Sequence, residues 1–170
     1  MAIFETIKYK VLKKDNKIEI REYDDILFAS TKSAYNQAQD SGFMNIFNYI
    51  SGENNKKAKI SMTTPVLTYK EEDKLVTSFY VPSKYNQDNI PKPSNEKVFI
   101  KNFSNSIYGV IKFSGRWTEK NFDKYDELLI DYLLENNYEI LSSRLILRYQ
   151  PPFVPAFLRR NEIAYQIRNK

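Results

Sequence analysis

TEKNFDKYDELLIDYLLENN, residues 118–137, holds the most regular hydrophobic pattern of the chain. Its apolar side chains recur three and four residues apart, which is the spacing of one helix face. They are Phe122, Tyr125, Leu128, Leu129, Tyr132 and Leu133. Thr118 is a favourable N-cap, and Asn136 or Asn137 can adopt the left-handed conformation that ends many helices. The stretch therefore predicts a helix over residues 119–135.

Strands are predicted on both sides of this helix. Residues 106–114 alternate apolar and polar positions, and residues 144–149 form a second alternating run after the helix. Ile163, Tyr165 and Ile167 alternate again near the end of the chain. A period of two is typical of strands, so the predicted order is strand, helix, strand, strand.

Residues 26–82 have the same order of predicted elements. A strand over residues 26–33 precedes a helix that ends near Ile50, and two strands follow. Two such β-α-β-β units predict an α+β fold: a distorted antiparallel β-barrel or sheet with two helices packed outside. We expect a single domain over residues 1–170, whose second half spans residues 106–168.

The N-terminal part of the chain predicts a β-hairpin. Residues 5–12 and 17–23 are the two strands, and residues 14–16 supply the turn. Ile18 and Ile20 alternate with charged residues, which is typical of a strand that is buried on one face only.

The first helix has an apolar face of its own. Phe43, Ile46, Phe47 and Ile50 recur at the spacing of one helix face, and the helix is expected to begin within residues 37–41. Two interpretations of Phe43 and Phe47 stay open. They pack in the core, or they line a ligand site.

Composition excludes several classes of chemistry. The 170-residue chain has no cysteine and no histidine, which excludes disulfides, thiolate chemistry, His-ligated metal and a Ser-His-Asp triad. The net charge of +5 favours an anionic partner. The basic residues are scattered, so we expect no nucleic-acid partner.

No apolar run reaches the roughly 18–20 residues that span a bilayer, and no signal-peptide pattern is present. We therefore expect a cytoplasmic protein.

The proline loop, residues 149–162, has three prolines within five residues. Proline lacks an amide hydrogen and has a fixed φ, so this segment is predicted to be a stiff, extended loop. Its other residues are mostly apolar, and they either cap one end of the core or form the wall of a pocket. Arg159 and Arg160 follow, and they either meet a ligand carboxylate or pair with acidic groups such as Glu162.

Several motifs, taken together, resemble the SOUL haem-binding protein family. The matching segments occur in family order over nearly the whole chain: residues 18–23, 47–54, 62–66, 80–82, 91–93, 113–115 and 149–162. The resemblance implies a distorted antiparallel barrel with two helices, akin to bacterial effector-binding domains. It also implies that haem or another porphyrin binds in a shallow apolar cleft beside the first helix, with the proline loop nearby.

The resemblance also implies a set of ligand-binding residues. Mapped by motif, they are Asp40, Phe43, Met44 and Phe47 on the first helix and Phe153 and Val154 of the proline loop. Met62, as a candidate ligand of an iron, and Arg159, as a candidate partner of a ligand carboxylate, complete the predicted set. Met62 has a second interpretation as a residue that fills a gap in the core. The segments 35–50 and 150–158 have no Lys or Arg to meet porphyrin propionates, and the chain has no axial His. We therefore expect reversible, non-covalent binding of a tetrapyrrole or a similar flat apolar anion, without His ligation.

Other functions remain open at this point. An enzyme that modifies a small ligand in the same cleft would depend on Glu, Asp, Tyr or Lys for proton transfer. A protein-interaction domain would use the helix face and the proline loop to contact its partner. We expect a monomeric binding module for a small molecule, without catalytic or metal-ligating residues.

Overall fold

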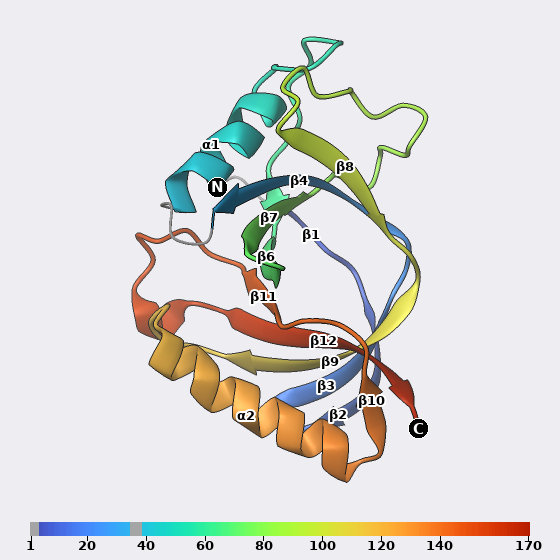
Figure 1. Ribbon diagram of the computed structural model, residues 1–170, viewed down its shortest axis with the longest axis vertical. Helices are drawn as coiled ribbons and strands as arrows, with labels where there is room; N and C mark the ends of the chain where they lie inside the picture. The colour runs from blue at the N-terminus through green and yellow to red at the C-terminus, as the bar shows by residue number, and fades with distance from the viewer. Residues whose placement is uncertain (1–3, 35–38) are drawn as a thin grey trace. The chain divides into compact units, whose positions relative to one another are not determined.

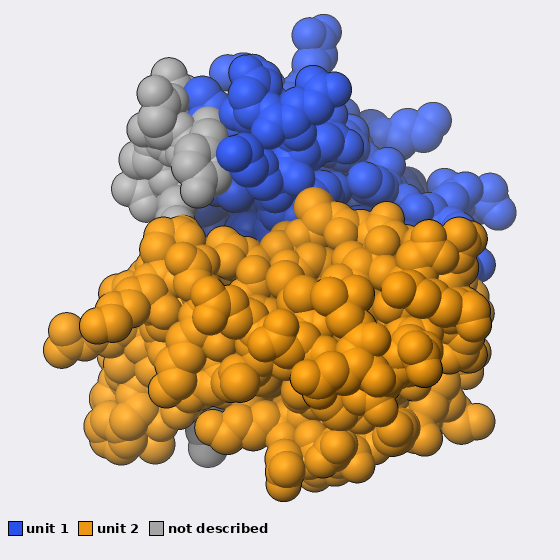
Figure 2. All heavy atoms as spheres, turned by 60° about the horizontal axis from the view of Figure 1, so that its bottom comes forward, with its two compact units in different colours: residues 1–7, 25–104 blue, residues 8–24, 105–170 orange. Residues whose placement is uncertain are grey.

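The computed structural model describes residues 4–34 and 39–170 of the chain (Figure 1). The described chain forms two compact units, coloured separately in Figure 2. Unit 1 comprises residues 1–7 and 25–104, and unit 2 comprises residues 8–24 and 105–170. Each unit is an antiparallel sheet with one helix packed on it. The prediction of an α+β fold with a distorted antiparallel sheet is therefore confirmed.

Unit 1 contains the first helix. Its elements are β1 (Glu5–Thr6), β4 (Ile26–Ala34), α1 (Gln39–Ile50), β5 (Thr63–Thr64), β6 (Val66–Glu71), β7 (Lys74–Tyr80) and β8 (Val98–Phe103). The sheet has the order β6-β7-β4-β8, and all of these pairs are antiparallel. Strands β1 and β5 form a separate short parallel pair. Residue 37, a predicted start of the helix, lies outside the described residues.

Unit 2 contains the second helix. Its elements are β2 (Lys10–Asp15), β3 (Ile18–Tyr23), β9 (Ser106–Phe113), α2 (Glu119–Glu135), β10 (Tyr138–Ile140), β11 (Leu145–Arg148), the 3-10 helix η1 (Ala156–Leu158) and β12 (Asn161–Asn169). The sheet has the order β2-β3-β9-β12-β11, and β10 pairs with the far part of β12. Within each unit the described strands form an open sheet.

Helix α2 has the predicted bounds and caps. The Thr118 side chain accepts a hydrogen bond from the amide of Asn121 at 3.2 Å, and Asn137 has a φ of 63°. Phe122, Leu129 and Leu133 are buried against the sheet of unit 2. These residues of the predicted stripe form the core contact, whereas Leu128 of the same stripe is 50% exposed, so its assignment to the buried face is wrong.

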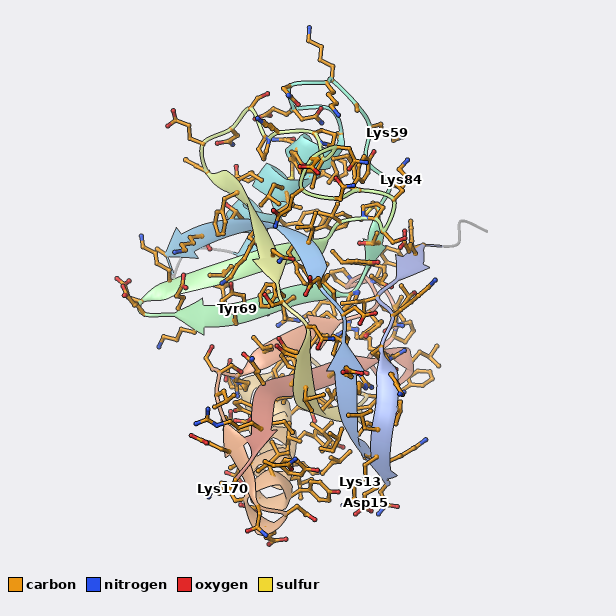
Figure 3. All side chains as sticks on the ribbon, turned by 90° about the vertical axis from the view of Figure 1, so that its right-hand side faces the viewer. Lys13, Asp15, Lys59, Tyr69, Lys84 and Lys170 are labelled. Atoms are coloured by element: carbon orange, nitrogen blue, oxygen red, sulfur yellow. The ribbon has the colours of Figure 1, made fainter. Side chains whose placement is uncertain are left out.

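A cluster of aromatic rings and one cation lies on the sheet of unit 1. Tyr69 of β6 is labelled in Figure 3, and its hydroxyl accepts a hydrogen bond from the Nζ of Lys101 on β8 at 3.0 Å. The same ammonium group lies 5.1 Å from the ring centroid of Phe103, which meets the Tyr69 ring edge-on at 6.4 Å. These contacts join strands that are not neighbours in the sheet, and they indicate how strongly the sheet twists.

Several predicted elements differ from the structure. The strand predicted over residues 5–12 is two strands, because the amide of Ile7 binds the carbonyl of Thr64 and β2 begins only at Lys10. Strand β10 was not predicted, because its three residues are too few to show the alternation of apolar and polar side chains that is typical of a strand. The proline loop is extended only in part, because residues 156–158 form the 3-10 helix η1.

Gly109 of β9 lies where α2 approaches the sheet most closely. A Cβ built on Gly109 would lie 2.6 Å from Cδ2 of Leu133, whose side chain is fully buried. We expect Gly109→Ala to lower the free energy of unfolding by about 1–3 kcal/mol through overpacking. Urea unfolding of Gly109→Ala, Leu133→Ala and the double variant checks this. The losses should be far from additive, and strictly additive losses would contradict the contact.

Candidate functional site

Helix α1 presents an exposed apolar strip, which we define as Phe43, Met44 and Phe47. Their side chains are 43%, 48% and 41% exposed, respectively. The rings of Phe43 and Phe47 stack, with centroids 6.2 Å apart and planes inclined by 22°. The core interpretation of these two phenylalanines is therefore wrong, and the strip is an aromatic surface that faces outward.

The rest of α1 fixes the direction of this strip. Ile46, Tyr49 and Ile50 are buried in the core of unit 1. The Tyr49 hydroxyl donates to the carbonyl of Pro91 at 2.6 Å. A Cβ added to Gly42 would lie only 3.2 Å from Oγ1 of Thr77 on β7. The helix is therefore held tightly on the sheet, and it cannot turn the strip inward without losing these contacts.

The side chain of Asn54 stabilises the turn that follows α1. Its amide group donates to the carbonyls of Tyr49 and Ala58 at 3.1 and 2.8 Å. Its carbonyl oxygen accepts from the amides of Lys56 and Ala58. Gly52 has a φ of 131°, which only glycine adopts readily. The motif over residues 47–54 thus has a structural role, which is to end α1 and return the chain to the sheet.

Met62 also belongs to unit 1. It directly precedes β5 and is 37% exposed, so the interpretation as a residue that fills a core gap is wrong. The described residues contain no group of three or more acidic side chains that would hold a metal ion. Met62 therefore offers an accessible thioether without an established metal site around it.

The proline loop is exposed rather than a cap on the core. Phe153, Phe157 and Leu158 are among the most exposed large apolar side chains of the described chain. Arg159 holds the loop from within. Its Nε donates to the carbonyl of Val154 at 2.9 Å and its Nη2 to the carbonyl of Pro152 at 2.7 Å.

Unit 2 contains a buried charge network that the sequence pattern did not indicate. Arg21 is fully buried and forms two parallel hydrogen bonds of 2.8 Å with the Glu162 carboxylate. It also donates to Glu19 at 2.7 Å and to the Tyr23 hydroxyl at 2.9 Å. Arg160 donates to Glu162 at 2.9 Å, so the structural role considered for Arg160 is confirmed. Strand β3 is therefore buried on both faces, not on one as predicted.

Aromatic rings enclose the same network. The Arg21 guanidinium lies 3.9 Å from the ring centroid of Tyr9, and the Arg160 guanidinium lies 3.9 Å from that of Tyr149. Burial alone would raise the pKa of Glu162, but the hydrogen bonds and charges of Arg21 and Arg160 outweigh it and hold that pKa below its usual value. This carboxylate is 0% exposed and accepts from two arginines, so the network has a structural role.

Comparison with solved structures defines the class of fold. The C-terminal domain of EcmrR superposes with a TM-score of 0.66 at 11% identity, covering 95% of this chain and 99% of that domain. A structure described as a hydrolase from Listeria innocua superposes with a TM-score of 0.60 at 7% identity, covering 92% and 94%. The chain therefore shares the α+β fold of these two proteins.

Sequence comparison then defines the family. The model of the SOUL heme-binding protein family matches residues 4–166, and the chain belongs to this family. "Heme-binding protein 2" of Mus musculus is 34% identical over 107 residues, which are 57% of this chain and 52% of that protein. "Heme-binding protein 1" of Xenopus laevis is 26% identical over 155 residues, covering 85% and 80%. The match thus spans about half the length of the first relative.

Proposed function

We propose that this protein reversibly binds haem, another tetrapyrrole or a similar flat apolar anion on the exposed strip of α1. The stacked and exposed pair of Phe43 and Phe47 is the observation that carries the proposal. Membership of the SOUL heme-binding protein family supports it, as do the names of the two relatives.

The strip suits the shape of such a ligand. A porphyrin is a flat aromatic plane, and aromatic side chains bind planes of this kind by offset stacking. Phe43 and Phe47 are inclined by only 22°, so a flat ligand stacked on one ring lies nearly parallel to the other. Met44 adds a flexible, polarisable thioether beside them. The residues of the strip therefore fit the ring of the group.

The iron of a haem would find no histidine in this chain. Bound haem supplies light absorption and redox chemistry, while Phe43, Met44 and Phe47 hold its plane and exclude water from one side. Met62 is a further proposed contact in unit 1. Binding by surface contact rather than by His coordination is expected to be reversible.

Haem titration tests the proposal. We expect a saturable change in the Soret band whose spectrum lacks bis-histidine character. Phe43→Ala/Phe47→Ala should weaken the apparent affinity about tenfold or more, because two stacking contacts are lost. Phe99→Ala is the matched control, since Phe99 alternates on β8 with the core residues Val98 and Ile100 and so lies on the sheet face away from α1.

The possible results of the titration test two claims separately: that the protein binds haem, and that the binding site is on α1. The absence of any saturable change up to the solubility limit of haem would contradict the function itself. Saturable binding that Phe43→Ala/Phe47→Ala leaves unchanged would contradict the location on α1 and retain the ligand class.

A further inference from the structure

The apex of the proline loop is an uninterrupted apolar surface. Residues 151–158 contain only Pro, Phe, Val, Ala and Leu. Phe153 is 86% exposed, Phe157 75% and Leu158 61%. Side chains of this kind rarely gather in the open on a monomeric soluble protein unless the surface has a binding role.

Five of the eight backbone carbonyls of this apex accept hydrogen bonds from within the chain, and that of Pro151 accepts from the amide of Val154 at 3.2 Å. The carbonyls of Pro152 and Val154 accept from the Arg159 side chain. The carbonyl of Pro155 accepts from the amide of Leu158 at 2.9 Å, and that of Ala156 accepts from the amide of Gly115 at 3.0 Å. The three prolines have no amide hydrogen to satisfy. This internal bonding lowers the number of backbone groups that lose water when the apex contacts an apolar phase.

This arrangement disfavours the usual ways in which a loop binds another protein. A proline-rich ligand for peptide-binding domains has the extended polyproline conformation, whereas residues 156–158 form a 3-10 helix. Addition to a sheet edge needs free backbone donors and acceptors, which are largely occupied here. Contact with lipid needs no free backbone groups, and internal bonds such as those to the carbonyls of Pro152 and Val154 favour it.

Cations flank the apex. Arg116 is exposed in the segment between β9 and α2, next to Gly115, which bonds to the loop. The Arg159 guanidinium lies 4.4 Å from the ring centroid of Trp117, beside the apex. Glu119 and Asp123, at the start of α2, are paired with Arg144. The side chains that flank the apex directly are thus positively charged, as an anionic lipid surface requires.

We propose that the proline loop docks on anionic membrane surfaces by inserting Phe153, Phe157 and Leu158 into the interfacial layer of the bilayer. Arg116 and Arg159 then lie at the level of the lipid phosphates. The docking is peripheral, and within the described residues no helix is long and apolar enough to cross a membrane. The proposal stands on unit 2 alone and does not depend on ligand binding by α1.

Co-sedimentation of the full chain with vesicles tests the proposal. The probe is phosphatidylcholine with about 30% phosphatidylserine. We expect the wild type to bind, and Phe153→Ser/Phe157→Ser to lose affinity about tenfold or more, because two inserted rings are removed. Leu134→Ser is the matched control, since Leu134 is an apolar residue 49% exposed on α2 of the same unit. It should bind like the wild type.

The fluorescence of Trp117 reports directly on insertion of the proline loop, because Trp117 is the only tryptophan of the chain. Its indole nitrogen donates to Asn161 at 2.8 Å, so it is fixed beside the proline loop. Vesicles with brominated acyl chains should quench its fluorescence in the wild type and in Leu134→Ser. They should leave Phe153→Ser/Phe157→Ser largely unquenched. Arg116→Glu should weaken binding to the anionic vesicles.

Several results would overturn the proposal. A wild type that stays in the supernatant, or a double variant that binds as tightly as the wild type, shows that the loop does not dock on lipid. Binding that about 0.5 M salt abolishes, with no contribution from Phe153 or Phe157, assigns it to charge alone. Self-association that the double variant removes, without vesicle binding, assigns the apex to a second copy of the chain.

Discussion

Glu162→Ala is expected to lower the free energy of unfolding by about 3–5 kcal/mol, because it leaves Arg21 buried without its main counter-charge. Arg21 and Glu162 are both 0% exposed and share two hydrogen bonds of 2.8 Å. The remaining bond to Glu19 cannot replace a bidentate carboxylate. Urea unfolding at about pH 7 measures the loss, and the melting temperature should fall with it.

Glu139→Ala is the matched control for this variant. The Glu139 carboxylate also bonds an arginine, Arg168, at 2.7 Å, but both side chains are largely exposed to solvent. Solvent screens such a pair, so we expect no measurable loss. Equal losses for Glu162→Ala and Glu139→Ala would contradict the view that burial makes the first pair important.

The dependence on pH follows from the lowered pKa of Glu162. A carboxyl group whose pKa is lower in the folded state stabilises the protein fully above its unfolded value of about 4.3. That contribution is lost as the pH falls through the folded pKa. The difference between the wild type and Glu162→Ala should therefore narrow below about pH 4. A difference that stays constant to lower pH would contradict ionisation of Glu162 in the native state.

Leu129→Ala is expected to lower the free energy of unfolding by about 2–5 kcal/mol, because it opens a cavity between α2 and the sheet of unit 2. Leu129 is fully buried in a cluster with Ile111, Phe122, Leu133 and Ile163. A rigid sheet and a capped helix can collapse only partly into the space. Chemical unfolding monitored by circular dichroism measures the change.

The neighbouring residue provides the control. Leu128 has the same side chain on the same helix and is 50% exposed. Leu128→Ala should change the free energy of unfolding by less than about 0.5 kcal/mol. If both variants lost the same stability, the orientation of α2 on the sheet would be wrong.

Periodic patterns predicted the helices well because one stripe of each helix meets a sheet. Residues 119–135 were predicted to the residue, since the cap of Thr118 and the left-handed Asn137 coincide with the ends of the apolar stripe. The end of α1 at Ile50 was equally clear. Local spacing carries this information, so no knowledge of the rest of the fold was needed.

Burial of polar groups was not predictable from the same patterns. Arg21 alternates with apolar residues as a solvent-exposed residue would, and only its distant partner Glu162 explains its burial. The partners are 141 positions apart in sequence, beyond the reach of any local period. Phe43 and Phe47 show the opposite error. Their spacing is that of a buried helix face, but the face of α1 that packs on the sheet is too narrow to include them.

The division of the chain also sets an order of events during synthesis. Unit 2 consists of residues 8–24 and 105–170, whereas residues 25–104 belong to unit 1. Strand β3 therefore leaves the ribosome early but meets β9 only after the whole of unit 1 has emerged. Arg21 can bond to Glu162 only later, after β12 has been synthesised. A nascent chain that stalls before residue 162 thus leaves Arg21 with Glu19 but without its bidentate partner.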